Sequence, residues 1–241
     1  GFWPVRCSPF PKGMDRQDSI VSLHEDIATF SHSAYTAPAT MGLAYARGAA
    51  KRTLDLAIAI PALLLLSPLL TLLAIAVGLE TKGPAIFRQT RLGIHGAPFR
   101  ILKFRTMTVL ENGPVIKQAE IGDARITRFG AWMRRLSIDE LPQLINVING
   151  DMSLVGPRPH AMAHDRFYGH EIAGYNLRQS VKPGISGWAQ IHGHRGATVT
   201  VSRMRERLAY DVWYSRNATF ALDLQIIFRT ILEVFRQRNA Y

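Results

Sequence analysis

The sequence predicts an α/β protein that is mostly helical, with a membrane-embedded helical segment followed by a compact, membrane-associated domain of short strands and interfacial amphipathic helices. The run from Leu56 to Leu79 contains no charged residue, and it is longer than the ~20 apolar residues that cross a bilayer core. Beyond residue 80 the chain is dense in Gly, Pro and Arg, and short extended segments alternate with helical periodicities. A hydrophobic content of 47% is sufficient for a buried core in 241 residues.

The composition changes twice along the chain and indicates three segments. Residues 1–50 are rich in Ser, Pro, Thr, Ala and Gly, so we expect a largely disordered N-terminal extension with a short helix around residues 19–30. Residues 51–80 contain the membrane segment, and residues 81–241 form the domain that follows it. The single cysteine, Cys7, excludes an internal disulfide and is typical of a reducing compartment.

Ser67 and Pro68 divide the membrane segment into two halves, each ~16 Å long at the helical rise. Proline removes a helical hydrogen bond and clashes with the preceding turn, which predicts a break or a sharp kink. Cationic residues flank both ends of the segment, so the positive-inside rule indicates no orientation. A re-entrant helix-break-helix hairpin satisfies both observations better than a tilted spanning helix or a buried soluble helix.

In the following domain we expect two strands and three helices, joined by rigid loops at VGPRP and VKPGISGWAQ. The loops are rigid because proline fixes φ and glycine permits turns. The broad apolar side of the last helix either packs on the domain or lies in the membrane interface. The strands are expected at residues 85–93 and 97–107, and the helices at 124–136, 139–148 (stopping at Asn149-Gly150) and 220–241.

A net charge of +11 and a pI near 10.3 favour an anionic partner, such as nucleic acid, acidic lipid or a phosphorylated substrate. A nucleic-acid partner is not expected, because no recognition motif is present. Guanidinium groups bind phosphate through paired hydrogen bonds, and Arg158 is favoured because prolines on both sides hold its backbone rigid. The arginines that accompany turn residues are Arg88, Arg91, Arg105, Arg125, Arg128, Arg134, Arg135 and Arg158.

Two adjacent carboxylates, Asp139 and Glu140, follow a pair of arginines. Ser137 and Glu140 fit the capping box, which would place both acids in the first turn of a helix. The capping box leaves Asp139 unexplained. A carboxylate can attack phosphorus and hold a covalent intermediate, and a neighbouring carboxylate can hold Mg²⁺. The pair therefore indicates phosphoryl transfer, with a simple helix cap as the alternative.

Six stretches together resemble the bacterial sugar transferase family, the small monotopic polyprenyl-phosphate phosphoglycosyl transferases. The resemblance extends from about Lys51 to the end of the chain, and it is strongest to the undecaprenyl-phosphate glucose and galactose phosphotransferases of exopolysaccharide synthesis. The stretches are KRTLDL, GPAIFRQTRLG, KFRTM, RITRFG, LSIDELPQLINVINGDMSLVGPRP and KPGISGWAQ.

The resemblance implies transfer of hexose 1-phosphate from a UDP-hexose, glucose or galactose, to undecaprenyl phosphate. The products would be undecaprenyl-diphosphate-hexose and UMP, in the first step of exopolysaccharide repeat-unit assembly. The resemblance also implies that Asp139 is the nucleophile of a covalent aspartyl-phosphosugar intermediate and that Glu140 is linked to a Mg²⁺ cofactor. The resemblance places Arg134 and Arg158 at a phosphate, and the full set of candidate phosphate- or substrate-binding residues is Lys103, Arg105, Arg134, Arg158 and Arg88.

The same resemblance implies a membrane break at Ser67 and Pro68, contact with membrane lipid, and a place in the bacterial inner membrane with the catalytic domain on the cytoplasmic face. Ser186 and His192 stand where members often have Thr and Asn, so the hexose and the polysaccharide stay open, as does the oligomeric state. Two alternatives to this mechanism remain. One is a non-catalytic membrane scaffold of a polysaccharide assembly complex, and the other is direct attack of the lipid phosphate with Asp139 only binding metal.

Overall fold

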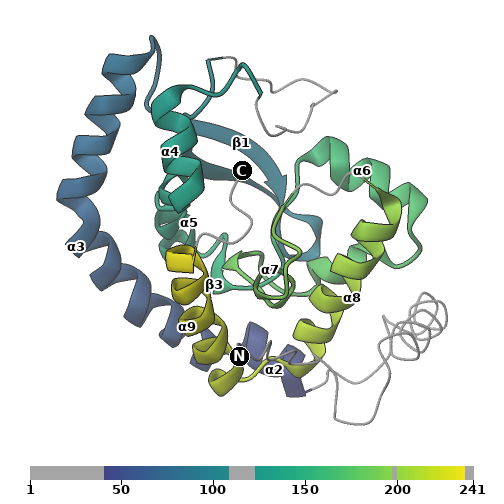
Figure 1. Cartoon of the computed structure of the whole chain (residues 1–241). Coiled ribbons are helices and arrows are strands. Elements are labelled where there is room, and N and C mark those ends of the chain that lie inside the picture. The colour runs from purple at the N-terminus through teal and green to yellow at the C-terminus, as the bar shows by residue number, and fades with distance from the viewer. Residues whose placement is uncertain (1–40, 109–122, 197–199, 237–241) are drawn as a thin grey trace, which may run out of the picture.

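The computed structural model describes residues 41–108, 123–196 and 200–236, which form a mostly helical domain with two small sheets (Figure 1). The expected helix around residues 19–30 lies outside the described residues. The first helix in the described residues is α2 (Met41–Arg47), which packs against α8 (Val201–Asn217). Gly42 permits this contact, because a Cβ there would lie 2.1 Å from the carbonyl oxygen of Arg216. Residues 41–50 therefore belong to the fold, which corrects the expected end of the N-terminal extension.

The apolar segment forms one helix, α3 (Ala49–Glu80), and within the described residues it alone has the length and hydropathy of a membrane span. Figure 1 shows α3 curving around one side of the domain. Pro68 has no N–H to donate to the carbonyl of Leu64, and the Ser67 hydroxyl donates to that oxygen instead, at 2.8 Å. The helix continues through Ser67-Pro68, so of the expected break or sharp kink the structure shows no break, and the re-entrant arrangement stays a prediction.

Both ends of α3 are attached to the same domain. Near its start, Lys51 Nζ lies 2.6 Å from Asp223 Oδ2 of α9 (Phe220–Arg236). At its end, the Arg105 guanidinium donates to carbonyl oxygens of the last turn and the residues after it. One face of α3 packs against the domain along the helix, through side chains such as Leu63, Leu66 and Leu73, and the opposite face is apolar and exposed in the middle. The large apolar side chains exposed there are Ile60, Leu64, Leu65, Leu69 and Leu72.

The strands β1 (Ile86–Leu92) and β2 (Pro98–Phe104) form an antiparallel hairpin, as the alternation of the sequence predicts. Lys103 pairs with Phe87 across the hairpin. Cross-strand partners share a face of a sheet, and successive residues point to opposite faces. Lys103 and Arg88 therefore lie on opposite faces of the hairpin.

The helix α5 (Gln143–Asn149) is joined to β2 by the side chain of Asn146, which is 2% exposed. Asn146 Oδ1 accepts from the Leu102 amide at 3.0 Å, and its Nδ2 donates to the Arg100 carbonyl at 2.8 Å. The helix ends at Gly150 with φ of 90°, so the predicted stop is confirmed. Because Asn146 satisfies two backbone groups of β2, it sets the spacing between the hairpin and α5.

The second sheet pairs β3 (Ser153–Val155) in parallel with β4 (Gly184–Ser186). Two glycines meet backbone to backbone beside it, since a Cβ on Gly184 would lie 2.1 Å from the Gly156 nitrogen. The stretch VKPGISGWAQ, expected as a rigid loop, thus contains a strand and also the short helix α7 (Trp188–Ile191). This close approach places the VGPRP loop directly against the start of β4.

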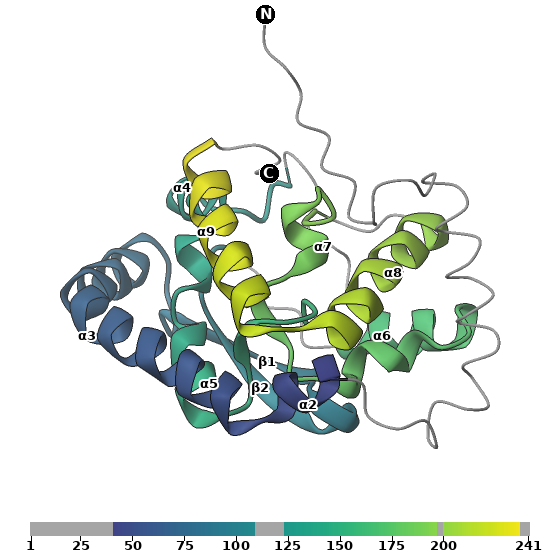
Figure 2. The ribbon, with the colours of Figure 1, turned by 90° about the horizontal axis from the view of Figure 1, so that it is seen from below.

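Figure 2 shows α3 along one side of the domain and α6 (Met162–Glu171) and α8 on the other, with the strands between them. A 3-10 segment, η3 (Tyr175–Ser180), follows α6 and packs on α8. The main core cluster draws its side chains from α3, α5, α8 and α9, among them Ala59, Val147, Tyr214 and Ile226.

The C-terminal helix α9 packs on the domain, which was one of the two alternatives that the sequence left open, and its contact with the membrane interface stays a prediction. Asp223 and Ile226 are fully buried against the domain. On the other side, large apolar side chains recur at helical spacing and are exposed. The helix therefore packs by one face and presents an apolar stripe by the other. The stripe consists of Phe220, Leu224, Phe228 and Ile231.

Candidate active site

Asp139 and Glu140 lie in a single 3-10 turn, η2 (Ile138–Glu140), between α4 (Arg128–Leu136) and α5. Ser137 ends α4 in the left-handed conformation, with φ of 57°, and its side chain makes no cap hydrogen bond to η2. The predicted capping box is therefore wrong, and both acids precede α5 instead of occupying its first turn. A non-glycine residue in this conformation is strained by about 1–2 kcal/mol, so surrounding contacts must hold the turn.

Glu140 is held by two cations from different elements. Lys103 Nζ of β2 lies 2.8 Å from Oε1, and Arg158 donates from Nη1 to Oε2 at 3.0 Å and from Nη2 to Oε1 at 2.5 Å. Burial works to raise the pKa of Glu140, but the charges of Arg158 and Lys103 and their hydrogen bonds hold it well below its usual range. Glu140 is therefore ionised at neutral pH, and Arg158 binds it through two nitrogen atoms while Lys103 binds it through one.

Asp139 lies beside Glu140 and is 7% exposed. Its side chain has no hydrogen bond to any residue in the described ranges. Burial raises the pKa of Asp139 to about 6, the charge of Glu140 adds to the rise, and Lys103, Arg134 and Arg158 oppose it. At neutral pH the carboxylate is ionised, largely desolvated and free of donors, which are the properties of an activated nucleophile.

Two further arginines approach the acid turn, and neither forms an ion pair with a described residue. Arg134, in the last turn of α4, is close enough to lower the pKa of Asp139. Arg195, from the loop after α7, donates to the hydroxyl of Ser137. Burial lowers the pKa of the Arg195 guanidinium, while the carboxylates of Glu140 and Asp139 oppose that effect. Sequence reasoning missed Arg195, although it stands between glycines in GHRGAT and fits the pairing of arginine with turn residues.

Two predicted phosphate ligands lie elsewhere. Arg105 is 4% exposed and donates to the carbonyl oxygens of Val77, Thr81 and Lys82, where a cation stabilises the C-terminal end of α3. Arg88 is exposed on the hairpin face opposite to Lys103. The prediction that Arg105 and Arg88 lie at the substrate site is therefore wrong. The structure brings the other three candidates, Lys103, Arg134 and Arg158, to the acid pair.

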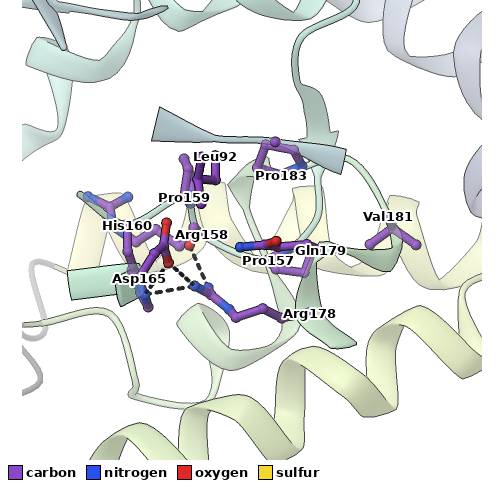
Figure 3. Close-up of a pocket in the computed structure, with 11 residues that line it drawn as sticks. Leu92, Pro157, Arg158, Pro159, His160, Asp165, Arg178, Gln179, Val181 and Pro183 are labelled. Atoms are coloured by element: carbon purple, nitrogen blue, oxygen red, sulfur yellow. Dashed lines mark hydrogen bonds and ion pairs between the residues drawn. The ribbon is translucent and has the colours of Figure 1, made fainter. Parts of the chain in front are cut away.

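The loop that carries Arg158 is held through three successive carbonyl oxygens. The Pro157 carbonyl accepts from the first amide of β4 at 2.9 Å, and the Pro159 carbonyl accepts from Arg91 Nη1 at 3.4 Å. The Arg158 carbonyl accepts from Arg178 Nη2 at 2.6 Å. Figure 3 shows Pro157, Arg158, Pro159 and Arg178 among the residues that line a small pocket. Because proline has no N–H, the carbonyl oxygens are the main backbone groups through which the fold can hold this loop and so orient the Arg158 side chain.

A magnesium ion usually binds one or two carboxylates together with substrate phosphates. Within the described ranges no group of three His, Cys, Asp or Glu side chains could hold a metal by itself. Asp139, however, carries no hydrogen bond to a described residue, and Glu140 is adjacent to it and ionised. The donor set therefore fits a magnesium ion that shares its coordination with substrate oxygen atoms.

The acid turn has a marked excess of positive charge. Lys103, Arg134, Arg158 and Arg195 surround two carboxylates, and only Glu140 is paired. Such an arrangement attracts a ligand with more than one negative charge, because the unpaired guanidinium groups retain free donors. A polyanion bound here would meet the donor-free carboxylate of Asp139.

Comparisons with known proteins identify the family of this chain. A family model described as "Bacterial sugar transferase" matches residues 46–237, which confirms the resemblance in the sequence. The UDP-glucose:undecaprenyl-phosphate glucose-1-phosphate transferase of Escherichia coli (strain K12) is 50% identical over 191 residues, covering 79% of this chain and 41% of the relative. A protein of the same name from Caulobacter vibrioides is 52% identical over 191 residues, covering 79% of this chain and 72% of the relative.

Another relative differs in the sugar that its name specifies. The UDP-N-acetylgalactosamine-undecaprenyl-phosphate N-acetylgalactosaminephosphotransferase of Aeromonas hydrophila is 42% identical over 182 residues, covering 75% of this chain and 42% of the relative. This chain thus spans about two fifths of the length of the Escherichia coli and Aeromonas hydrophila proteins. The matched region includes the acid turn and the loop that carries Arg158.

Proposed function

Because this chain belongs to the bacterial sugar transferase family, we propose that it transfers hexose 1-phosphate from a UDP-hexose to undecaprenyl phosphate. The products are undecaprenyl-diphosphate-hexose and UMP, and the reaction begins exopolysaccharide repeat-unit assembly. The observation that supports this most is Asp139, an ionised, buried carboxylate without a hydrogen bond to described residues, next to a clamped Glu140. Glucose is the first donor to test, since two relatives are named for it.

The proposed chemistry has two displacements at phosphorus. A carboxylate oxygen of Asp139 attacks the phosphorus that carries the sugar, the bond to the UMP oxygen breaks, and UMP leaves with the electron pair. The aspartyl-phosphosugar is then attacked by a phosphate oxygen of undecaprenyl phosphate, which forms the diphosphate and releases the Asp139 carboxylate. Each step replaces one P–O bond by another, so no oxidant or reductant is needed.

The surrounding cations have distinct proposed roles. Lys103 and Arg158 fix Glu140 and keep two positive charges beside the reacting phosphorus, where charge accumulates. Arg134 and Arg195 have free donors and bind the diphosphate of the donor. A magnesium ion, held by Asp139 or Glu140 together with the substrate, would neutralise the charge of the transferring phosphate.

We further propose that α3 enters and leaves the membrane on one face. Its two ends are both attached to the domain, through Lys51 and through the carbonyls bound by Arg105, so a straight spanning helix would have to detach one of them. The exposed middle of α3 and the apolar stripe of α9 then contact lipid. We propose that this face is the cytoplasmic face of a bacterial inner membrane, because UDP-sugars are made in the cytoplasm.

The topology can be tested by labelling single cysteines on a Cys7→Ser background. Arg47→Cys and Lys82→Cys are both exposed and flank the two ends of α3. In inverted vesicles a membrane-impermeant maleimide is expected to label both positions. Labelling of only one position in inverted vesicles, with the other labelled from the opposite face, would establish a spanning helix and refute the re-entrant arrangement.

The activity is tested by UMP release in detergent with Mg²⁺, undecaprenyl phosphate and a panel of UDP-sugars. Wild-type protein is expected to release UMP, and Asp139→Asn to release none while remaining folded. Recovery of a phosphosugar adduct on Asp139 in the absence of lipid acceptor would support the covalent route. Activity without such an adduct would indicate direct attack by the lipid phosphate. Absence of UMP release from every donor by folded protein would indicate the non-catalytic scaffold.

A further inference from the structure

Arg178 is a buried arginine that the proposed chemistry does not use. It lies in η3, is 4% exposed, and forms an ion pair with Asp211 of α8, which is 2% exposed. Asp211 Oδ2 accepts from Arg178 Nε at 3.1 Å and from Nη2 at 2.9 Å. A charge pair at this depth is costly to desolvate, and replacing it by apolar residues is often neutral or stabilising. Stability alone therefore gives a weak reason for an ion pair in this place.

The guanidinium of Arg178 joins this ion pair to the active site. The same Nη2 that faces Asp211 also donates to the Arg158 carbonyl oxygen, at 2.6 Å. Figure 3 shows Arg178 beneath the loop, with a dashed contact to Arg158. The Arg158 guanidinium in turn reaches both carboxylate oxygens of Glu140. One continuous series of contacts thus runs from α8 through Arg178 and Arg158 to the residue next to Asp139.

The opposite edge of the Arg178 guanidinium contacts buried side chains that make no described contact with Asp139 or Glu140, and it forms a second ion pair, with Asp165 Oδ1 at 3.7 Å. Arg178 Nη1 lies 3.1 Å from the Tyr175 hydroxyl and 2.7 Å from His160 Nδ1. The Tyr175 hydroxyl donates to Asp165 Oδ1 at 2.8 Å. Nη2 of Arg178 therefore contacts the backbone of the active-site loop, whereas Nη1 contacts buried side chains. A variant that removes only a contact of Nη1 serves as a control for general damage to this cluster.

We propose that Arg178 is a positioning residue for the transfer reaction: held by Asp211, it fixes the Arg158 backbone so that the Arg158 guanidinium meets both oxygens of Glu140. This inference rests on the proposed function. Bidentate contacts require both nitrogen atoms in place, and a displacement of ~1 Å in a reacting group can cost ~100-fold in rate. The three carbonyls of the loop are each held by a different element, and Arg178 supplies the donor for the central one.

The decisive variant is Arg178→Lys. Lysine keeps a positive charge opposite Asp211, so the buried carboxylate stays paired, but one ammonium group cannot reproduce the planar fork that serves Asp211 and the Arg158 carbonyl together. We expect kcat for UMP release to fall about 10- to 100-fold and KM for the UDP-sugar to change less than about threefold, because geometry at the acid pair is lost and not donor binding. Asp211→Asn, which loosens the same guanidinium from the other side, is expected to show the same pattern.

Tyr175→Phe is the matched control. It removes a buried hydroxyl that contacts Arg178, His160 and Asp165, so it perturbs the same cluster. The contact between Arg178 and the Arg158 carbonyl stays in place. The two variants are compared under conditions in which each has lost the same amount of thermal stability relative to wild type. Tyr175→Phe is then expected to keep kcat within about threefold of wild type, whereas Arg178→Lys is expected to lose more than that. Equal kcat losses in the two variants would show a merely structural role and overturn the proposal.

A double-mutant cycle with Arg158→Lys completes the test. If Arg178 acts through Arg158, then Arg178→Lys lowers kcat by less than about threefold once Arg158 is already lysine. Full multiplication of the two effects would overturn the inference while leaving the proposed function intact. If Arg178→Lys does not fold, Asp211→Asn takes its place in the same cycle. A wild-type protein that releases no UMP from any donor would instead refute the proposed function itself.

Discussion

Replacing Asp139 by asparagine removes a carboxylate that is ionised at neutral pH although burial and the charge of Glu140 both disfavour its ionised form. The pKa of Asp139 is raised from 3.8 to about 6, and each pKa unit corresponds to about 1.4 kcal/mol, so the ionised side chain costs about 3 kcal/mol of folding free energy at neutral pH. Asparagine is still a buried polar group, and we therefore expect a net stabilisation of about 1–3 kcal/mol. The variant should be inactive and yet more stable than wild type.

The pH dependence gives the prediction its sign. Because the pKa of Asp139 in the folded protein lies above its unfolded value, the carboxyl is protonated in both states below about pH 4 and causes no loss there. The loss develops between about pH 4 and pH 6 and is complete at pH 7. The difference in stability between Asp139→Asn and wild type should therefore grow over this range.

Thermal unfolding in detergent, followed at pH 4.5 and pH 7.5, measures this difference. We expect the midpoint of Asp139→Asn to exceed that of wild type by about 2–10 °C at the higher pH and by less at the lower one. Glu140→Gln is the matched control, because it leaves Lys103 and Arg158 without their carboxylate and should be destabilising by about 2–4 kcal/mol. An Asp139→Asn protein that is no more stable than wild type at pH 7.5 would refute the reasoning.

Three further predictions follow from the site and the loop that supports it. Attack requires ionised Asp139, whose pKa is about 6. The rate of UMP release is therefore expected to fall as the pH drops through 6 and to level off above about pH 7. A pH profile that stays flat down to pH 5 would contradict this. Arg195→Ala is expected to raise KM for the UDP-sugar about 10-fold. Ser137→Ala removes the hydrogen bond between Ser137 and Arg195 and should leave KM near wild type. Equal effects of the two variants on KM would indicate that Arg195 only supports the turn. Gly184→Ala places a Cβ 2.1 Å from the Gly156 nitrogen and should lower the unfolding midpoint by several degrees. Gly78→Ala has no atom within 4 Å of its added Cβ and should leave the midpoint unchanged. Similar midpoints for the two variants would contradict the close approach of Gly184 and Gly156.

Local patterns predicted several elements correctly, because they depend on backbone preferences and on the period of apolar residues. The alternation in residues 85–107 predicted the hairpin, and the end of α5 at Gly150 followed from the permissive backbone of glycine. The length of the apolar run predicted α3. That α3 continues through Pro68 without a break was not predictable from proline alone, because the Ser67 hydroxyl donates to the carbonyl that proline leaves without its helical donor.

The sequence by itself also pointed to Asp139, Glu140 and Arg158, since adjacent acids and a proline-flanked arginine are unusual enough to need a chemical reason. Only the tertiary structure decided which cations serve them. Lys103 is 37 residues from Glu140, and Arg195 is 58 residues from Ser137. A charged side chain carries no local mark of its partner, so Arg105 and Lys103 look equivalent in KFRTM until packing sends one to the end of α3 and the other to Glu140. Periodicity determines which face of an element is buried. The three-dimensional packing of distant elements determines which charges meet, because a buried charge without a partner costs free energy and that cost cannot be read from local sequence.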